Sequence, residues 1–160
     1  MPVKIQENIS LAPLTFYKIG GLVRYFFEAK NSEELREVLI FAANHGVPVF
    51  ILGAGSNILV SDNGYRGLVI RLGGGEVRTK GEYMLVGAGV MMARAAAEAS
   101  KAGLTGFEWA MGVPGTIGGS VRGNAGCFGS EMKDIIESGE IFDTETYERH
   151  ILSAADCQFA

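Results

Sequence analysis

Two glycine-rich stretches carry the residue types in this sequence that could do chemistry. The first is Gly53-Ala54-Gly55-Ser56-Asn57, which directly follows the apolar run at 48–52. Glycines at the carboxyl end of a strand let successive backbone N–H groups point at one anion, while a hydroxyl and an amide can donate to phosphate oxygens. The same glycines could instead serve a tight turn with positive φ. The residues leave both interpretations open, a pyrophosphate loop and a structural turn.

Two common phosphate-binding motifs do not fit this first loop. A dinucleotide-binding βαβ unit would need a third glycine where the chain has Ile58, with a helix opening there. A P-loop would need Gly-Lys-Ser/Thr after the glycines, and no such triplet follows. The stretch Gly87-Ala88-Gly89 imitates the βαβ motif, but Met92 at its third position is too large for close packing. We interpret that stretch as structural.

The second glycine-rich stretch runs from Gly112 to Gly119 and continues to Asn124-Ala125-Gly126. Its glycines and one proline fix a particular path and leave the backbone bare. A bare backbone suits a flat cofactor ring or a phosphate chain that must lie close. The alternative is a surface loop without a ligand.

The elements around these stretches indicate a mixed α and β fold. We expect a strand at 24–29 and a helix capped by Asn31 or Ser32, with one buried face; a buried strand at 48–52 would follow. This order predicts parallel pairing. Further strands are expected at 67–72 and 82–88, a helix at 90–102, an antiparallel pair at 136–143 and 147–152, and a short helix at 153–159 that begins at Ser153.

Composition narrows the class of protein. The chain has 160 residues and a net charge of −4, without a basic run, so we expect no nucleic-acid surface. It has no signal peptide and no apolar stretch long enough to span a membrane. Cys127 and Cys157 form no metal-ligand pattern and are interpreted as free thiols, and His45 and His150 as structural. We expect a cytoplasmic protein without a metal.

At three places the sequence resembles the UDP-N-acetylenolpyruvoylglucosamine reductase family. The matching segments are 15–21 (TFYKIGG), 52–60 (LGAGSNILV) and 112–119 (GVPGTIGG) with 124–126 (NAG), in the family's order and spacing. The resemblance covers essentially the whole chain. It implies an α+β fold of the vanillyl-alcohol-oxidase type, with a small α/β lobe at 1–72 and a larger, mostly antiparallel lobe at 73–160, FAD gripped between them, and the family's C-terminal substrate domain absent.

The resemblance also implies an activity and a set of binding residues. In the family, NADPH reduces a noncovalent FAD, and the flavin reduces UDP-N-acetylglucosamine enolpyruvate to UDP-N-acetylmuramate for peptidoglycan synthesis, on which the cell wall, cell shape and cell division depend. Covalent relatives often carry a histidine in the first loop, where this chain has Asn57. The cofactor residues implied here are Gly53, Ala54, Gly55, Ser56, Asn57, Ile58, Leu59, Pro114, Gly115, Thr116, Gly118, Gly119, Ala125 and Gly126.

The chain departs from the family in its catalytic residues. The family's arginine, serine and glutamate have no matching position up to Ala160, and neither Ser56, Ser120 nor Ser130 matches the serine's motif. We therefore expect no catalytic residue in this chain and little or no activity from it alone. Its expected protein partner is a missing C-terminal domain or a second copy of the chain.

Arg122 could reach the FAD or the UDP-sugar diphosphate, or lie solvated, and Phe128 stands where many members have a tyrosine near the substrate. The alternatives are a noncatalytic FAD- or nucleotide-binding module and a flavin oxidase of the same fold.

Overall fold

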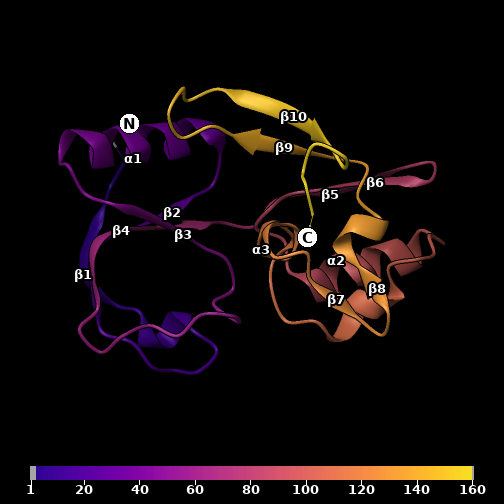
Figure 1. Cartoon of the computed structure of the whole chain (residues 1–160), viewed down its shortest axis with the longest axis horizontal. Coiled ribbons are helices and arrows are strands. Elements are labelled where there is room, and N and C mark those ends of the chain that lie inside the picture. The colour runs from indigo at the N-terminus through magenta and orange to yellow at the C-terminus, as the bar shows by residue number, and fades with distance from the viewer. Residues whose placement is uncertain (1–2, 160) are drawn as a thin grey trace. The chain divides into compact units, whose positions relative to one another are not determined.

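The computed structural model describes residues 3–159 and divides the chain into two compact units, Met1–Gly75 and Glu76–Ala160. Both units mix helices and strands (Figure 1). Among the described residues, no helix combines the length and the apolar character needed to cross a bilayer.

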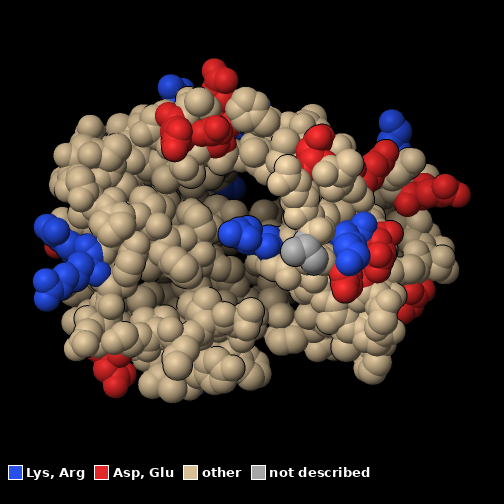
Figure 2. Space-filling model, viewed as in Figure 1, with Lys and Arg blue, Asp and Glu red and all other residues tan. Residues whose placement is uncertain are grey.

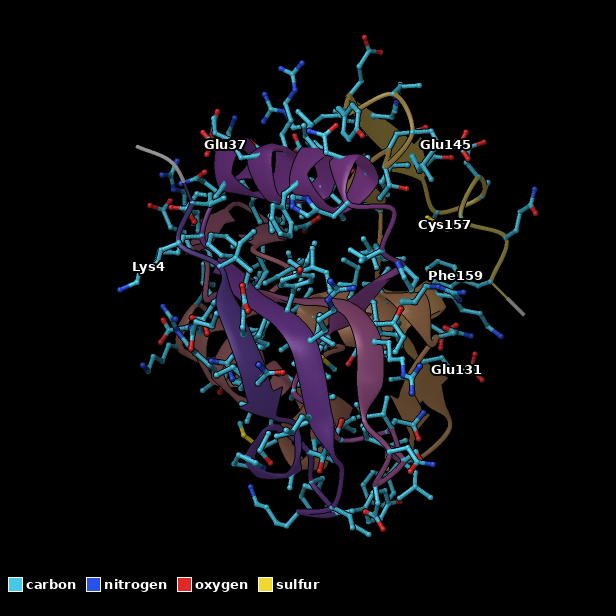
Figure 3. The ribbon with its side chains drawn as sticks, turned by 90° about the vertical axis from the view of Figure 1, so that its left-hand side faces the viewer. Lys4, Glu37, Glu131, Glu145, Cys157 and Phe159 are labelled. Carbon is cyan, nitrogen blue, oxygen red and sulfur yellow. The ribbon has the colours of Figure 1, made fainter. Side chains whose placement is uncertain are left out.

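Unit 1 is built on a four-stranded sheet whose order is β1-β2-β4-β3. β2 and β3 both run parallel to β4, and β1 runs antiparallel to β2. The strand–helix–strand order correctly predicted parallel strands, but β4 lies between β2 and β3, so those two do not pair. Figure 3 shows the strands side by side, with α1 running across them. The bounds are β1 Gln6–Ser10, β2 Leu22–Ala29, α1 Ser32–Asn44, β3 Val49–Leu52 and β4 Tyr65–Leu72, with a short 3₁₀ helix η1 at Ala12–Leu14.

Helix α1 forms as the sequence predicts. The side chain of Asn31 accepts the backbone N–H of Glu34 at 2.9 Å and so caps the first turn. Val38, Leu39 and Ala42 are buried, at the spacing of one helix face. Gly46, with φ 58°, follows the C-cap of the helix.

Strand β3 corrects the expectation of a buried strand at 48–52. Val49, Phe50 and Ile51 are 36%, 40% and 46% exposed, and only Leu52 is buried. The reason is topological, because β3 is the last strand in the order of the sheet. An apolar run cannot distinguish an edge strand from a central one.

Unit 2 packs around α2. Met92, Ala95 and Ala99 on this helix are buried with Phe107 and Trp109 of the segment that follows. The unit also contains three two-stranded sheets, all antiparallel. Its elements are β5 Val77–Lys80, β6 Tyr83–Val86, α2 Met92–Lys101, η2 Glu108–Gly112, α3 Ile117–Arg122, β7 Gly126–Cys127, β8 Ser130–Glu131, η3 Met132–Asp134, β9 Ser138–Phe142 and β10 Arg149–Ser153.

Several sequence-based expectations need correction in detail. The second glycine stretch contains a short helix, α3, and another short helix, η2, leads into it, where the sequence indicated a bare loop. The helix expected at 153–159 is a turn, in which Ser153 donates a hydroxyl hydrogen bond to Asp156 at 2.5 Å and terminates the strand. Strands β1 and β5 were not expected, since their sequences show no alternation of apolar and polar residues.

Charged side chains of both signs are interspersed on the face drawn in Figure 2, with uncharged surface between them. No continuous basic stripe crosses that face.

Candidate functional site

The first glycine loop follows β3, on the side of the sheet where the carboxyl ends of β2, β4 and β3 lie. The register places Leu52 opposite Arg71, and Ala29 opposite Leu72, so the carboxyl ends of the three parallel strands share this edge. Ligands of open α/β sheets bind outside the carboxyl ends of the strands. The predicted pyrophosphate loop therefore lies where this sheet would receive a ligand.

Gly55 is required by the packing of the chain itself. Its φ is +69°, and a Cβ on it would lie 2.2 Å from the carbonyl oxygen of Leu14. Its own carbonyl oxygen accepts the backbone N–H of Phe16 at 2.8 Å. The segment at 14–16 thus braces the loop from one side, and any ligand must approach from another.

No functional role is predicted from the sequence for the segment at 14–16 that braces the loop. Thr15 is 2% exposed, and its hydroxyl lies 3.0 Å from the carbonyl oxygen of Ile19 and 3.1 Å from that of Ala12. A hydroxyl bonded in this way fixes the turn that holds Phe16 against Gly55. The signal was present in the sequence as the motif at 15–21, although its role was not evident from residue types.

An apolar pocket of about 350 Å³ adjoins the loop within unit 1. Burial raises the pKa of Tyr65 above its ordinary value. Ile58 is half-buried and Leu59 is 74% exposed at the wall. The lining consists of Leu11, Thr15, Phe50, Leu52, Ile58, Leu59, Val60, Ser61, Gly64, Tyr65 and Val69.

An ion pair lies at the same sheet edge and was not predicted. Arg71 donates from Nε to Glu28 at 2.8 Å and makes a second contact to the same carboxylate oxygen. These residues are register partners on β4 and β2, and Arg71 is also paired with Leu52, the residue before Gly53. A pair 43 residues apart in sequence has no local signature, which is why it was missed.

The second glycine stretch is tied to the residues that precede α2. Gly118 donates to the carbonyl oxygen of Ala88 at 2.8 Å, and Ile117 donates to that of Val90 at 2.9 Å. A Cβ on Gly118 would lie 2.9 Å from that of Ala88, so this glycine also serves packing. The stretch 87–89 thus packs against the second loop, and this contact fits the structural role predicted for 87–89.

Gly119 differs from its neighbour. A Cβ added to it would meet only one neighbour, the hydroxyl oxygen of Thr116, at 3.3 Å. That oxygen accepts the N–H of Gly119 and caps α3. Gly119 therefore leaves its side of the backbone open to an approaching group, while Gly115 and Thr116 are buried and Pro114 and Arg122 are exposed.

Beyond α3 the chain forms a tight hairpin from β7 and β8. Gly126 pairs with Glu131, and Cys127 pairs with Ser130. Phe128 lies between the strands with φ 55° and is 93% exposed. A bulky residue with positive φ is strained, and an exposed aromatic ring has no burial to offset the strain. This combination is typical of a contact residue.

The remaining titratable candidates have ordinary structural roles. His45 is the C-cap of α1, where its ring stacks on Phe41 with centroids 3.9 Å apart. His150 lies in β10, and both cysteines are free. Across residues 3–159, no group of three or more His, Cys, Asp or Glu side chains is placed to hold a metal ion.

Comparison with known proteins identifies the family. Residues 23–147 match the family described as FAD binding domain, and this range contains both glycine loops. The chain belongs to this FAD-binding family. Its fold is the mixed α+β fold of the vanillyl-alcohol-oxidase type, as expected from the sequence.

Similar proteins that contain this FAD-binding domain include reductases. UDP-N-acetylenolpyruvoylglucosamine reductase from Synechococcus sp. (strain JA-3-3Ab) is 43% identical over 159 residues, and the protein of that name from Gloeobacter violaceus is 40% identical over 159 residues. Each alignment covers 98% of this chain but only 50% and 53% of the relative. The chain is a homologue of these reductases, spans about half of their length, and corresponds to their N-terminal FAD-binding portion.

Solved structures agree with this assignment of the FAD-binding domain. UDP-N-acetylenolpyruvylglucosamine reductase from Thermus caldophilus superposes with a TM-score of 0.78 at 32% identity, covering 96% of this chain and 53% of that one. The 6-hydroxy-D-nicotine oxidase of Arthrobacter nicotinovorans superposes with a TM-score of 0.70 at 16% identity. The second match shows only that an oxidase has a similar fold.

Proposed function

We propose that this chain binds FAD noncovalently and forms the flavin-binding part of an NADPH-dependent reductase. The substrate would be UDP-N-acetylglucosamine enolpyruvate and the product UDP-N-acetylmuramate, a peptidoglycan precursor, which suits a cytoplasmic enzyme. The observation that carries the proposal is the family match over 23–147, which includes both glycine loops. The names of the relatives support the reaction.

The first loop would hold the pyrophosphate of FAD. Its backbone N–H groups, with the hydroxyl of Ser56 and the amide of Asn57, provide donors at the carboxyl edge of the sheet. Gly53, Ala54 and Gly55 form the turn, and Ile58 and Leu59 continue into the apolar pocket. A polar cradle next to an apolar pocket fits a dinucleotide, because such a ligand carries both charged phosphates and flat rings.

The second stretch would approach the flavin side of the cofactor. Gly119 has the open backbone that a flat ring requires, and Thr116 and Gly118 hold it in place. Pro114, Gly115, Ala125 and Gly126 would complete the path, and Arg122 would face a phosphate of FAD or of the sugar nucleotide. When bound, the flavin supplies the hydride chemistry; the chain supplies position and exclusion of water.

Phe128 would contact the substrate. Its exposed ring can pack against a sugar or a ring of the cofactor without a hydroxyl. Turnover is proposed to need groups beyond this sequence, since the arginine, serine and glutamate of the family have no match here. A second candidate, a noncatalytic FAD-binding module, is supported by the same family match over 23–147.

Absorption spectroscopy tests the proposal. The purified chain, mixed with FAD and desalted, should retain absorption near about 370 and about 450 nm, the bands of a bound flavin. A protein that stays colourless after reconstitution would refute FAD binding. Oxidation of NADPH in the presence of the enolpyruvyl sugar then separates the two candidates. The reductase part should gain this activity when joined to the C-terminal half of a relative, whereas a noncatalytic module should not.

A further inference from the structure

We infer that Asn124 and Glu131 form a polar clamp that positions the hairpin carrying Gly126 and Phe128. This inference rests on the proposed function, because the groups it positions are the ones proposed to contact flavin and substrate. Neither residue belongs to the set of binding residues that the sequence predicted.

The clamp closes the base of the hairpin through side-chain hydrogen bonds. Asn124 donates from Nδ2 to the Glu131 carboxylate at 2.7 Å, and its Oδ1 accepts the backbone N–H of Lys133 at 3.1 Å. The ammonium of Lys133 lies 2.7 Å from the same Glu131 oxygen. One amide side chain thus joins the entry of the hairpin to its exit.

Backbone contacts continue the clamp into the core of unit 2. Ala125 donates to Ser120 at 2.9 Å, and Met132 donates to Ala125 at 3.0 Å. Met132 is 4% exposed and packs in the same cluster as Trp109. Met132, the residue after Glu131, is therefore fixed in the core of unit 2. The clamp links the hairpin to this fixed residue.

The hairpin itself has no room for adjustment at its base. A Cβ on Gly126 would lie 2.7 Å from Cγ of Glu131 and 2.7 Å from the carbonyl oxygen of Ser130. The backbone of Gly126 is thus pressed against the Glu131 side chain that Asn124 holds. A shift of this carboxylate would move the backbone proposed to face the flavin.

The charge state of Glu131 agrees with the geometry. Hydrogen bonds from Lys133 and then from Asn124 hold the pKa of its carboxyl below the ordinary value. At neutral pH the carboxylate is an acceptor only, as the amide of Asn124 requires.

Replacing Asn124 with glycine tests the clamp without disturbing the backbone. Asn124 has φ 43°, a conformation that glycine adopts freely, so Asn124→Gly removes only the side chain. We expect the Kd for FAD, measured by flavin fluorescence titration, to rise about tenfold, the equivalent of one hydrogen bond to a charged group. The absorption bands of the bound flavin should also move toward those of free FAD, whereas the fluorescence of Trp109 should stay unchanged.

Three control variants separate the clamp from general effects. Asn8→Gly makes the same exchange at another positive φ, 53°, in β1 of unit 1. Lys133→Met removes an ion pair whose partners are 44% and 41% exposed, and Glu131→Gln keeps an acceptor for Asn124. Asn8→Gly and Lys133→Met should bind FAD within about twofold of the unsubstituted chain, because both leave the hydrogen bond between residues 124 and 131 possible. Glu131→Gln keeps an acceptor but loses the charge, so its Kd for FAD should rise, although by less than that of Asn124→Gly.

Hydrogen exchange provides a measurement that needs neither FAD nor a variant. The amides of Ala125 and Met132 should exchange far more slowly than that of Gly129 at the tip. Equal rates would overturn the clamp, as would an Asn124→Gly protein whose FAD affinity and spectrum match the parent chain. Failure of the parent chain itself to bind FAD would refute the proposed function, and this inference with it.

Discussion

The two glycine loops look alike in sequence but use glycine differently. In the first loop, Gly55 faces the backbone at Leu14, which lies earlier in the chain. In the second, Gly118 faces Ala88 while Gly119 is open except for the cap oxygen of Thr116. The residue type alone does not distinguish a glycine that makes room for its own chain from a glycine whose backbone is open on one side. The comparison shows that only the neighbours of each missing Cβ distinguish them.

Gly55→Val should have the largest effect and break the first loop. The new side chain would meet a backbone oxygen and adopt a strained φ, so we expect a loss of more than about 4 kcal/mol in the free energy of unfolding. Circular dichroism during thermal unfolding measures this loss. The matched control is Gly74→Val, also at positive φ (60°) but with open space, which should lose only about 1–2 kcal/mol. Equal losses would show that φ strain alone matters at Gly55.

Gly118→Ala should have the next largest effect. A methyl group 2.9 Å from the Cβ of Ala88 overpacks the contact, at an expected cost of about 1–3 kcal/mol. Adding Ala88→Gly removes the facing methyl group and should restore most of the lost stability. A double variant as unstable as the sum of the single ones would contradict this contact.

Thr116→Val and Asn31→Ala compare two helix caps in which a side chain accepts a backbone N–H. Each removes a side-chain acceptor from a helix N-terminus, so each should cost about 1 kcal/mol by denaturant unfolding. Only Thr116→Val should also weaken FAD binding in a titration, because its cap holds Gly119 in place. If Asn31→Ala weakens FAD binding by the same factor, the effect is general and not specific to the second loop.

Gly119→Ala should have the smallest effect on stability and the most informative effect on binding. Alanine favours a helix over glycine, and the added methyl group meets only the Thr116 hydroxyl, so the free energy of unfolding should change by less than about 1 kcal/mol. The Kd for FAD should nevertheless rise, since a methyl group would occupy the open side of the backbone. An unchanged Kd would show that the cofactor does not approach this residue.

Local signals in the sequence predicted the elements well. Asn31 before an amphipathic run gave the start of α1, and α2 ends at Lys101, close to the end of the helix expected at 90–102. The expectation for β3 failed in burial because exposure depends on strand order, which no local pattern contains. The three motifs correctly predicted an N-terminal FAD-binding portion homologous to the reductases, and its fold; the family match over 23–147 and the similarity to the relatives and the solved reductase structure confirm both.

The interactions that shape the loops were beyond such reasoning. The contact between Gly55 and Leu14, the ion pair of Glu28 with Arg71, and the hydrogen bond between Asn124 and Glu131 each join residues brought together by folding. A list of binding residues drawn from motifs therefore contains both glycines that pack against their own chain, such as Gly55, and glycines whose backbone is open on one side, such as Gly119. The roles of individual residues in that list remain predictions.

The position of β4 between β2 and β3 also has a consequence for how unit 1 folds. Until residues 65–72 are available, β2 and β3 are separated by an empty strand position and cannot pair with each other. Contacts that span many residues are slow to form, since the chain must close a long loop first. During synthesis, β2 can pair with β1 as soon as both have left the ribosome, but β3 has no partner until β4 follows, so earlier intermediates would leave β3 unpaired.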